Sequence, residues 1–350
     1  MNPRYSIIIP VYNRPDEVDE LLDSLTRQTV AKNLFEVVVV EDGSAKPCRE
    51  VADKYAGSLN LHYFAKPNSG PGPSRNYGVE CASGDYVIIL DSDVILPEGY
   101  LAAVGNELEA HPCEAFGGPD RAGEGFTQVQ KAISYAMTSF FTTGGIRGGS
   151  AKKMDRFYPR SFNMGVRRDV YNQLDGFSHM RFGEDIDFSY RIFEHGFKAR
   201  LFSTAWVWHK RRTDFDKFFK QVFNSGIARI NLEKRHPGTM KLVHMLPMIF
   251  TLGVIALVLA AVVLRLLAVN PASGVGPLLW VYPLLPLFLF ITLVFADSSV
   301  RNRSLVIGFL SVEASFVQLM GYGLGFLSAW WKRCVRGEGE FGAFEHNFYE

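Results

Sequence analysis

The sequence predicts an α/β fold, in which an open and mostly parallel sheet with flanking helices is joined to a C-terminal membrane region. Two observations predict the sheet: short apolar runs alternate with amphipathic stretches over the first ninety residues, and polar residues follow the apolar runs. A third predicts the membrane region, because the chain beyond Leu242 turns strongly apolar in three long blocks. The formal net charge of +1 gives no reason to expect a nucleic-acid partner.

The elements of the predicted sheet follow one another in the order expected for parallel strands. Residues 5–13 are typical of a first strand, and Pro15 then begins a helix whose apolar residues recur at i, i+3, i+4 and i+7. Residues 35–44 are a continuous apolar run ending in acids and glycine, which is typical of a buried parallel strand. The elements after these are a strand at 59–64, a helix at 74–83 and a strand at 85–93.

Polar side chains crowd the predicted carboxyl ends of these strands, where open α/β sheets place their ligand crevice. Asp91 and Asp93 stand two positions apart directly after the apolar run 86–90. Because residues i and i+2 of a strand point the same way, we expect both carboxylates to reach one cation. Hard oxygen ligands suit Mg²⁺ or Mn²⁺. The other polar residues at these ends are Asn13, Arg14, Glu41, Asp42 and Asn68.

The apolar blocks are long enough to cross a hydrocarbon core of about 30 Å. Residues 242–267 and 278–296 qualify without reservation, whereas residues 305–331 contain Glu313 and Gln318 and either span the membrane or re-enter it. Charges at the C-terminal end add a conflict. Three spans from an inside start put the C-terminus outside, yet the cations at 332–336 favour the inside.

The stretch between the two regions predicts an amphipathic helix. Phe215, Phe218, Phe219 and Val222 recur at helical spacing, and lysines fill the other face. Such a helix suits the membrane interface, and the alternative is an ordinary helix packed on the globular domain. We favour the interface, since the apolar blocks begin shortly afterwards.

Four dispersed cysteines without a CxxC pair indicate a reducing compartment, and no secretory signal precedes the first domain. We therefore expect a multi-pass protein of a bacterial inner membrane with its first domain in the cytoplasm. The predicted parts are a globular domain at 1–212, an interfacial helix and linker at 213–237, membrane helices at 238–335 and a tail at 336–350.

Four segments in order resemble glycosyltransferase family 2, and the resemblance extends from about Tyr5 to His209. They are residues 6–14 (SIIIPVYNR), 37–44 (VVVVEDGS), 70–94 (GPGPSRNYGVECASGDYVIILDSDV) and 174–197 (LDGFSHMRFGEDIDFSYRIFEHGF). The resemblance implies a GT-A fold, a divalent metal (Mn²⁺ or Mg²⁺) and an inverting single displacement on a nucleotide sugar.

The resemblance also assigns roles to particular residues. It implies that Asp93, Asp91 and His209 hold the metal, and that Asp185 is the catalytic base with Glu184 beside it. An inverting reaction needs such a base, because the attacking hydroxyl must lose its proton opposite the leaving diphosphate. The acidic pair also suits the start of a helix, a reading compatible with catalysis. The implied nucleotide-sugar contacts are Pro10, Tyr12, Asn13, Arg14, Asp42, Asn68, Arg75 and Asp91.

Several further assignments keep an alternative open. His209 is either a metal or diphosphate ligand or a structural histidine. Asn163 is expected near the acceptor pocket, and Trp208 either stacks on a sugar or packs within a strand. Arg211 and Arg212 are expected to contact either the donor diphosphate or lipid headgroups.

The leading functional hypothesis is a non-processive transferase, since Gln221 is not followed by the Arg-Trp of the QxxRW motif that processive synthases carry. It would move one sugar from a UDP-, GDP- or dTDP-sugar to a lipid-linked or glycan acceptor in cell-envelope or exopolysaccharide assembly. One alternative is a polyprenyl-phosphate sugar synthase. An alternative of another class is a non-catalytic, membrane-bound nucleotide-sugar-binding scaffold.

Overall fold

The computed structural model describes residues 3–121, 125–143, 157–210, 213–269, 276 and 278–343. The chain divides into two compact units, one made of residues 1–124 and 150–210 and the other of residues 125–149 and 211–350. The second unit therefore takes a stretch from inside the predicted globular domain 1–212. Arg211 and Arg212 lie outside the described residues.

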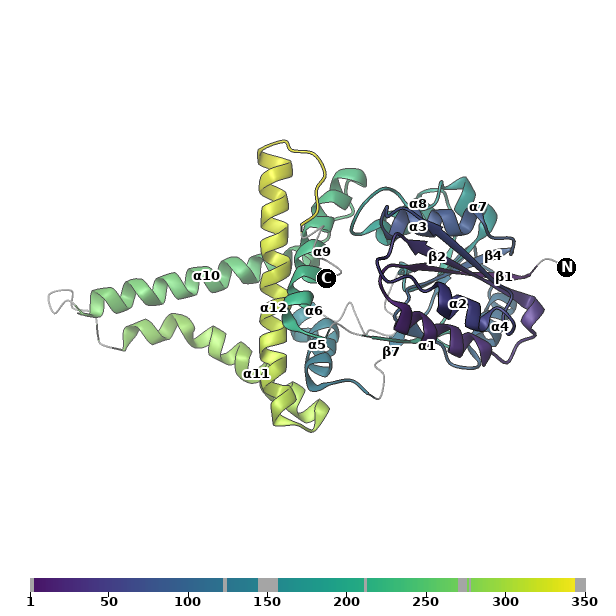
Figure 1. Ribbon diagram of the computed structural model, residues 1–350. Coiled ribbons are helices and arrows are strands. Elements are labelled where there is room, and N and C mark those ends of the chain that lie inside the picture. The colour runs from purple at the N-terminus through teal and green to yellow at the C-terminus, as the bar shows by residue number, and fades with distance from the viewer. Residues whose placement is uncertain are drawn as a thin grey trace. The chain divides into compact units, whose positions relative to one another are not determined.

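The first unit is built on a seven-stranded sheet in the order β3-β2-β1-β4-β8-β6-β9 (Figure 1). The first four strands in this order are mutually parallel, and β8 runs antiparallel to both of its neighbours. The predicted mostly parallel sheet is therefore confirmed. The strands are β1 (Tyr5–Val11), β2 (Phe35–Asp42), β3 (Leu61–Lys66), β4 (Tyr86–Leu90), β6 (Ala115–Gly117), β8 (Asn163–Arg167) and β9 (Ala199–Leu201).

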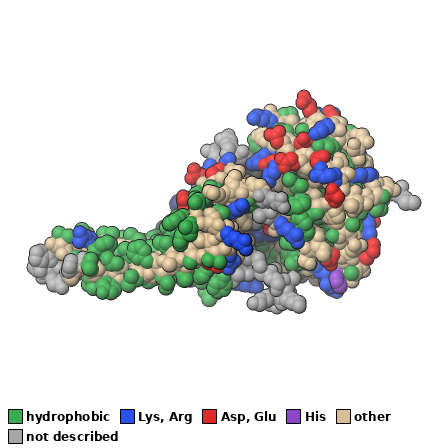
Figure 2. All heavy atoms as spheres, turned by 90° about the horizontal axis from the view of Figure 1, so that it is seen from below, with side chains coloured by type: hydrophobic (Ala, Val, Ile, Leu, Met, Phe, Trp, Pro, Cys, Tyr) green, Lys and Arg blue, Asp and Glu red, His purple; other side chains and the backbone are tan. Residues whose placement is uncertain are grey.

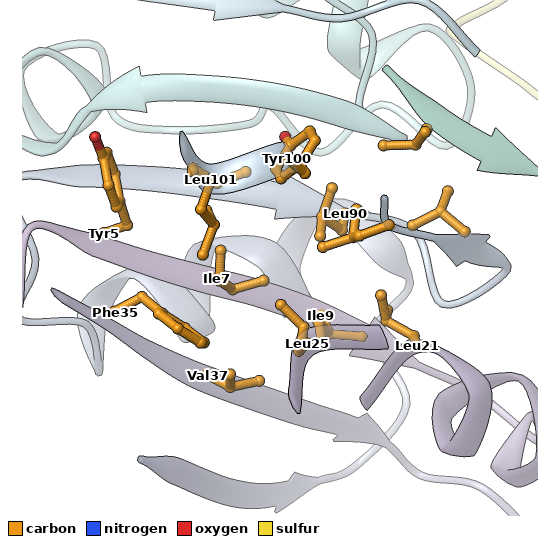
Figure 3. Close-up of a cluster of buried hydrophobic side chains, with 14 of the residues drawn as sticks. Tyr5, Ile7, Ile9, Leu21, Leu25, Phe35, Val37, Leu90, Tyr100 and Leu101 are labelled. Atoms are coloured by element: carbon orange, nitrogen blue, oxygen red, sulfur yellow. The ribbon is translucent and has the colours of Figure 1, made fainter. Parts of the chain in front are cut away.

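Helices cover both faces of this sheet, because alternate residues of its buried strands point to opposite sides. Ile7 and Ile9 of β1 pack with Leu21 and Leu25 of α1, as Figure 3 shows, whereas Ile8 packs on the other face. One face is covered by α1 (Pro15–Thr26), α2 (Arg49–Tyr55) and α4 (Tyr100–Ala110), and the other by α3 (Pro71–Glu80), α7 (Arg168–Gln173) and α8 (Glu184–Glu194). A short 3-10 turn, η1 (Lys32–Leu34), precedes β2.

A second, three-stranded sheet lies in the same unit, in the order β5-β10-β7. Its central strand β10 (Val207–His209) pairs with β5 (Val94–Ile95) on one side and β7 (Asp120–Arg121) on the other. This sheet matters for the site because it brings three distant parts of the chain to the end of β4.

The second unit is helical (Figure 1). Three of its helical stretches, residues 242–269, 279–302 and 305–335, are long and apolar enough to cross a membrane. Its described elements are α5 (Gln128–Thr138), α6 (Phe140–Thr143), α9 (Phe215–Arg235), α10 (Leu242–Val269), η4 (Leu279–Leu284), α11 (Leu285–Asn302), α12 (Leu305–Trp330) and a π-turn, η5 (Trp331–Val335).

The amphipathic helix predicted around residue 215 is present as α9. Its apolar face is not open to lipid, however, because Phe218 and Val222 are buried against α5 and α12. The periodicity predicted a buried face correctly, but sequence alone did not reveal that protein covers it.

Candidate active site

The candidate cation ligands meet where β4 ends. Asp91 and Asp93 lie in the turn between β4 and β5, not within a strand as predicted. Pairing of His209 with Val94 brings the imidazole over this turn. Ligand atoms of Asp91, Asp93 and His209 all lie within 4.8 Å of one another. The turn and the pairing thus achieve what strand alternation was expected to do.

His209 lies between two carboxylates. Its Nε2 is 3.2 Å from Asp93 Oδ1, and its Nδ1 is 3.8 Å from Asp120 Oδ2. The ring of Phe162 stacks on the imidazole with centroids 4.9 Å apart. Burial alone would lower the pKa of His209, but Asp93 foremost, together with Asp120, raises it to about 10. The two carboxylates therefore create a negative potential around the imidazole, which attracts positive charge.

A divalent cation fits this cluster on the chemistry of its donors. Two carboxylates offer the hard oxygen atoms that Mg²⁺ and Mn²⁺ prefer, and a histidine nitrogen is a common ligand of transition metals. Asp120 stands on the far side of the imidazole, where a carboxylate orients a ligating histidine in many metal sites.

Arg75 links this cluster to the start of α8. One guanidinium nitrogen donates to Asp91 Oδ1 at 2.9 Å and another donates to Glu184 Oε1 at 2.8 Å. Burial alone would lower the pKa of Arg75, but Asp91 and Glu184 raise it above its usual range, so the side chain stays charged. Arg75 thus contacts two carboxylates in this structure, and its contact with the nucleotide stays a prediction.

The acidic pair at the start of α8 divides into two different environments. Burial raises the pKa of Glu184, although Arg75 acts in the opposite direction. Asp185 instead accepts a 2.7 Å hydrogen bond from Arg160 Nε, and its other oxygen accepts from the backbone N–H of Ile186. Asp185, foremost, raises the pKa of Arg160. Glu184 is thus surrounded by buried groups, whereas Asp185 is paired with Arg160, which is partly exposed.

The predicted nucleotide-binding loops are tied to one another. Asp42 accepts hydrogen bonds from the backbone N–H groups of Ser69 and Gly70 and pairs with Lys66 at 2.5 Å. Asn68 donates its amide to the carbonyl of Asp42 at 2.8 Å. A methyl group on Gly43, at φ +72°, would lie 2.6 Å from the backbone nitrogen of Asn68, so the close approach of these loops requires glycine there.

The loop after β1 joins the same edge. Asn13, with φ +56°, donates its backbone N–H to Ser44 Oγ at 2.7 Å, and its side-chain oxygen accepts from the N–H of Lys46. Arg14 pairs with Glu17 at 2.6 Å. Pro10 and Tyr12, at the end of β1 and just after it, are partly exposed.

Two predicted acceptor contacts lie in different settings. Asn163 is 1% exposed, accepts from Tyr100 and donates to the carbonyl of Ala205, so it braces the interior. Because no part of its amide reaches the surface, we leave it out of the proposed acceptor site. Trp208 is partly exposed and packs edge-on against Trp206, with the centroids of the two rings 4.6 Å apart.

Sequence reasoning missed Asp120, Arg160 and Phe162. A usable signal for Asp120 was the preceding Gly-Gly-Pro, because a methyl group on Gly118 would lie 1.7 Å from the carbonyl oxygen of Ala205. Such a glycine marks a close approach of two backbones, here beside β10. Arg160 and Phe162 have no comparable local signal, since tertiary contacts alone bring them to the site.

The first unit has the GT-A fold of nucleotide-sugar transferases. Its sheet is mostly parallel, the candidate cation ligands lie in the turn after β4, and the acidic start of α8 is linked to that turn. Residues 6–175 form a domain of glycosyl transferase family 2, because the model of that family matches them. The resemblance seen in the sequence is thereby confirmed.

Curated relatives are similar over parts of their length. Poly(ribitol-phosphate) beta-N-acetylglucosaminyltransferase TarS of Staphylococcus aureus is 39% identical over 31% of this chain, a match that spans only 19% of TarS. Glycosyltransferase AglE of Haloferax volcanii is 26% identical over 66% of this chain and 74% of AglE. A solved structure of the mannosyltransferase PcManGT from Pyrobaculum calidifontis, in complex with GDP-Man and Mn²⁺, has a TM-score of 0.58 at 15% identity. It covers 95% of this chain and 88% of that one, which supports the fold.

Proposed function

We propose that this chain is a metal-dependent, inverting glycosyltransferase that moves one sugar from a nucleoside diphosphate sugar to a lipid-linked acceptor. The observation that carries the proposal is the group of Asp91, Asp93 and His209, of which the two aspartates lie within the stretch that the family 2 model matches. The likeness to TarS, which is named as a poly(ribitol-phosphate) transferase, supports an acceptor of the cell envelope.

On the donor side, Asp91, Asp93 and His209 would hold the cation. A bound Mn²⁺ or Mg²⁺ would neutralise the charge that develops on the leaving diphosphate. Arg75 keeps Asp91 in place from behind, because its guanidinium also bonds to the buried Glu184. The loops that contain Asn13, Asp42 and Asn68 are fixed by hydrogen bonds, and the nucleoside would bind to them at the carboxyl edge of the sheet.

On the acceptor side, Asp185 would be the general base. The acceptor hydroxyl oxygen forms a bond to the anomeric carbon as the bond to the diphosphate oxygen breaks, and the hydroxyl proton passes to Asp185. The nucleoside diphosphate leaves with the bonding electrons. Arg160 Nε donates to the Asp185 carboxylate at 2.7 Å and so fixes the orientation of that carboxylate. Attack from the face opposite the diphosphate inverts the anomeric configuration.

A lipid-linked acceptor and attachment to the cytoplasmic face of a bacterial inner membrane complete the proposal. The three long apolar helices support it, because they would keep a lipid-linked substrate and the enzyme in the same membrane. An acceptor of polyprenyl phosphate alone would make the chain a lipid-linked sugar synthase with the same site.

The test is transfer by the detergent-purified full chain from UDP-, GDP- and dTDP-sugars, with and without Mn²⁺. Acceptors are polyprenyl phosphate, a polyprenyl-diphosphate glycan, or none. We expect one donor to react only with metal and to give a product of inverted anomeric configuration. Asp185→Asn should lose about 10²- to 10⁴-fold in turnover while still binding nucleotide with Mn²⁺. Asp93→Asn should lose both turnover and metal-dependent nucleotide binding.

Asp53→Asn is the matched control, because Asp53 is an exposed carboxylate paired with Arg49 on the surface. It should behave as wild type. Metal-dependent nucleotide binding without turnover of any donor and acceptor pair would favour the non-catalytic scaffold. Full activity of Asp185→Asn would remove the base from the mechanism.

A further inference from the structure

The three apolar helices of the second unit differ in what surrounds them. Only 6% of the apolar stretch of α10 is buried within the protein, and the same holds for the η4–α11 stretch, whereas 44% of that of α12 is buried. Figure 2 shows hydrophobic side chains covering the arm that α10 and α11 form. The protein therefore leaves two helices to be covered by another apolar medium, and covers much of the third itself.

Contacts of α12 involve the first third of α10, and they run from the middle of the η4–α11 stretch, where the rings of Phe290 and Phe316 have centroids 5.7 Å apart, to its end. A methyl group on Gly323 of α12 would lie 2.2 Å from Thr251 Oγ1, ten residues into α10. At the other side, Ser311 bonds to Ser298 near the end of α11 at 2.7 Å. Beyond these contacts, α10 and α11 extend away from α12 (Figure 1). Three spans packed side by side would instead touch along their length.

Helix α9 accompanies α12 over most of its length. Phe218 packs in one cluster with Ala314. Further along, a methyl group on Gly226 would lie 2.2 Å from the carbonyl oxygen of Tyr322, and at the end Arg333 donates to Asn231 Oδ1 at 2.5 Å. The two helices thus run in the same direction and must lie at the same depth.

This shared depth decides where α12 lies in the membrane, because α9 is too polar to lie in the hydrocarbon core. Seven of its 21 residues are charged, namely Asp216, Lys217, Lys220, Arg229, Glu233, Lys234 and Arg235.

 A helix with a third of its residues charged does not cross a bilayer beside α12, because charges in hydrocarbon are costly. Glu313 adds to this, since it is exposed on α12 itself and has no ion pair among the described residues.

We propose that the chain crosses the membrane twice, through α10 and η4–α11, and that α12 lies with α9 along the membrane surface. The partner is the lipid bilayer: its hydrocarbon core would surround the α10–α11 arm, and its headgroup layer would meet the exposed side of α12, where Phe309, Leu324 and Trp331 lie. The C-terminal end would then be on the same side as α9.

The lengths and charges of the arm fit two crossings. Residues 242–264 of α10 are uncharged apart from His244 near the start, and as a helix they span about 35 Å. The distal end has Arg265 over the ring of Trp280, 5.9 Å from its centroid, as expected where a cation and an aromatic ring meet the far headgroups. Two crossings also place the cations at 332–336 on the same side as Lys241, Arg301 and Arg303, which removes the charge conflict of a three-span topology.

The experiment uses two cysteines in the full chain, one native and one introduced. Cys334 is exposed near the C-terminal end, and Gly276 between α10 and η4 is exposed with open space around its Cα. An impermeant maleimide is added to intact bacterial spheroplasts and to permeabilised ones. We compare wild type, Cys334→Ser, and Cys334→Ser combined with Gly276→Cys.

We expect outside labelling of Gly276→Cys at least tenfold above Cys334→Ser, and labelling of Cys334 only after permeabilisation. Outside labelling of Cys334 in wild type, lost in Cys334→Ser, would overturn the proposal, as would protection of Gly276→Cys from outside. C-terminal fusions provide the second measurement: green fluorescent protein should fluoresce and alkaline phosphatase should be inactive, and the reverse pattern would again mean three crossings.

This inference rests on the proposed membrane attachment, which is tested separately. Release of the chain by alkaline carbonate would defeat the attachment itself, whereas a membrane-integral chain with an outside C-terminus would defeat only the two-crossing topology. Neither result depends on transferase activity.

Discussion

The two ends of the main sheet both bury carboxylates but give them different partners. At the amino end, Glu36 of β2 accepts hydrogen bonds from Ser6 Oγ at 2.6 Å and from the N–H of Ser83 at 2.6 Å. At the carboxyl end, Asp91 and Glu184 are held by the guanidinium of Arg75. Neutral donors act on Glu36 more strongly than His62, whose Nε2 lies 3.6 Å from Glu36 Oε2. At the carboxyl end, cationic partners hold charge in a place where a ligand can compete for it. The type of partner therefore separates a structural acid from a functional one.

The largest effect should follow from removing the cation that joins the functional acids. Arg75→Met would leave Asp91 and Glu184 without their shared partner, and loss of one member of a buried ion pair costs about 3–5 kcal/mol. We expect the lower end, about 3 kcal/mol, because Asp91 remains partly exposed. Thermal unfolding in detergent measures the loss, and Mn²⁺ titration should show weaker binding as Asp91 moves.

Arg75→Lys is the companion variant in case the methionine variant does not fold. A single ammonium group cannot reproduce the forked contact, so we expect most of the stability to return but not all of the Mn²⁺ affinity. Unchanged metal binding in both variants would show that Arg75 does not position Asp91.

A smaller effect should follow at the far side of His209. Asp120→Asn keeps the shape of the side chain but removes the negative charge 3.8 Å from Nδ1. Loss of a carboxylate behind a ligating histidine typically weakens metal binding by 10- to 100-fold. We expect about tenfold weaker Mn²⁺ binding by calorimetry with little change in thermal stability. Equal affinities for Mn²⁺ would mean that Asp120 does not orient the ligand.

The contrast between the sheet ends also marks what sequence could predict. Asp91 and Asp93 could be found because they adjoin a buried strand, and α1 because its apolar spacing is local. Arg160 could not, since only the position of α8 brings it to the site. Asp120 was marked only indirectly, by the glycine at 118 that the close approach beside β10 requires. The same limit applies to α12: its composition predicts a membrane span, but its contacts with α9 depend on residues about a hundred positions away. Candidate ligands could be predicted from their neighbours in sequence, whereas the side chains that contact them from distant parts of the chain could not.

The smallest expected effect on the site comes from a change at the structural end of the sheet. Burial alone would raise the pKa of Glu36, but hydrogen bonds from Ser6 and Ser83 outweigh burial and hold it below its ordinary value of 4.5. A carboxyl whose pKa is lowered on folding stabilises the protein above its unfolded pKa, and the benefit is lost as the pH falls through the folded pKa. Glu36→Gln should therefore lower the free energy of unfolding at pH 7 by about 1–3 kcal/mol.

The pH dependence makes this prediction specific. Because glutamine does not titrate, the difference in stability between wild type and Glu36→Gln should be largest near neutral pH and shrink below about pH 4. Thermal unfolding across this range measures it, with turnover and Mn²⁺ affinity at pH 7 as the comparison. Both should match wild type, since Glu36 lies at the opposite end of the sheet from the cation ligands. A difference that grows toward acid pH, or a loss of metal affinity, would mean that the two ends do not divide folding from binding as proposed.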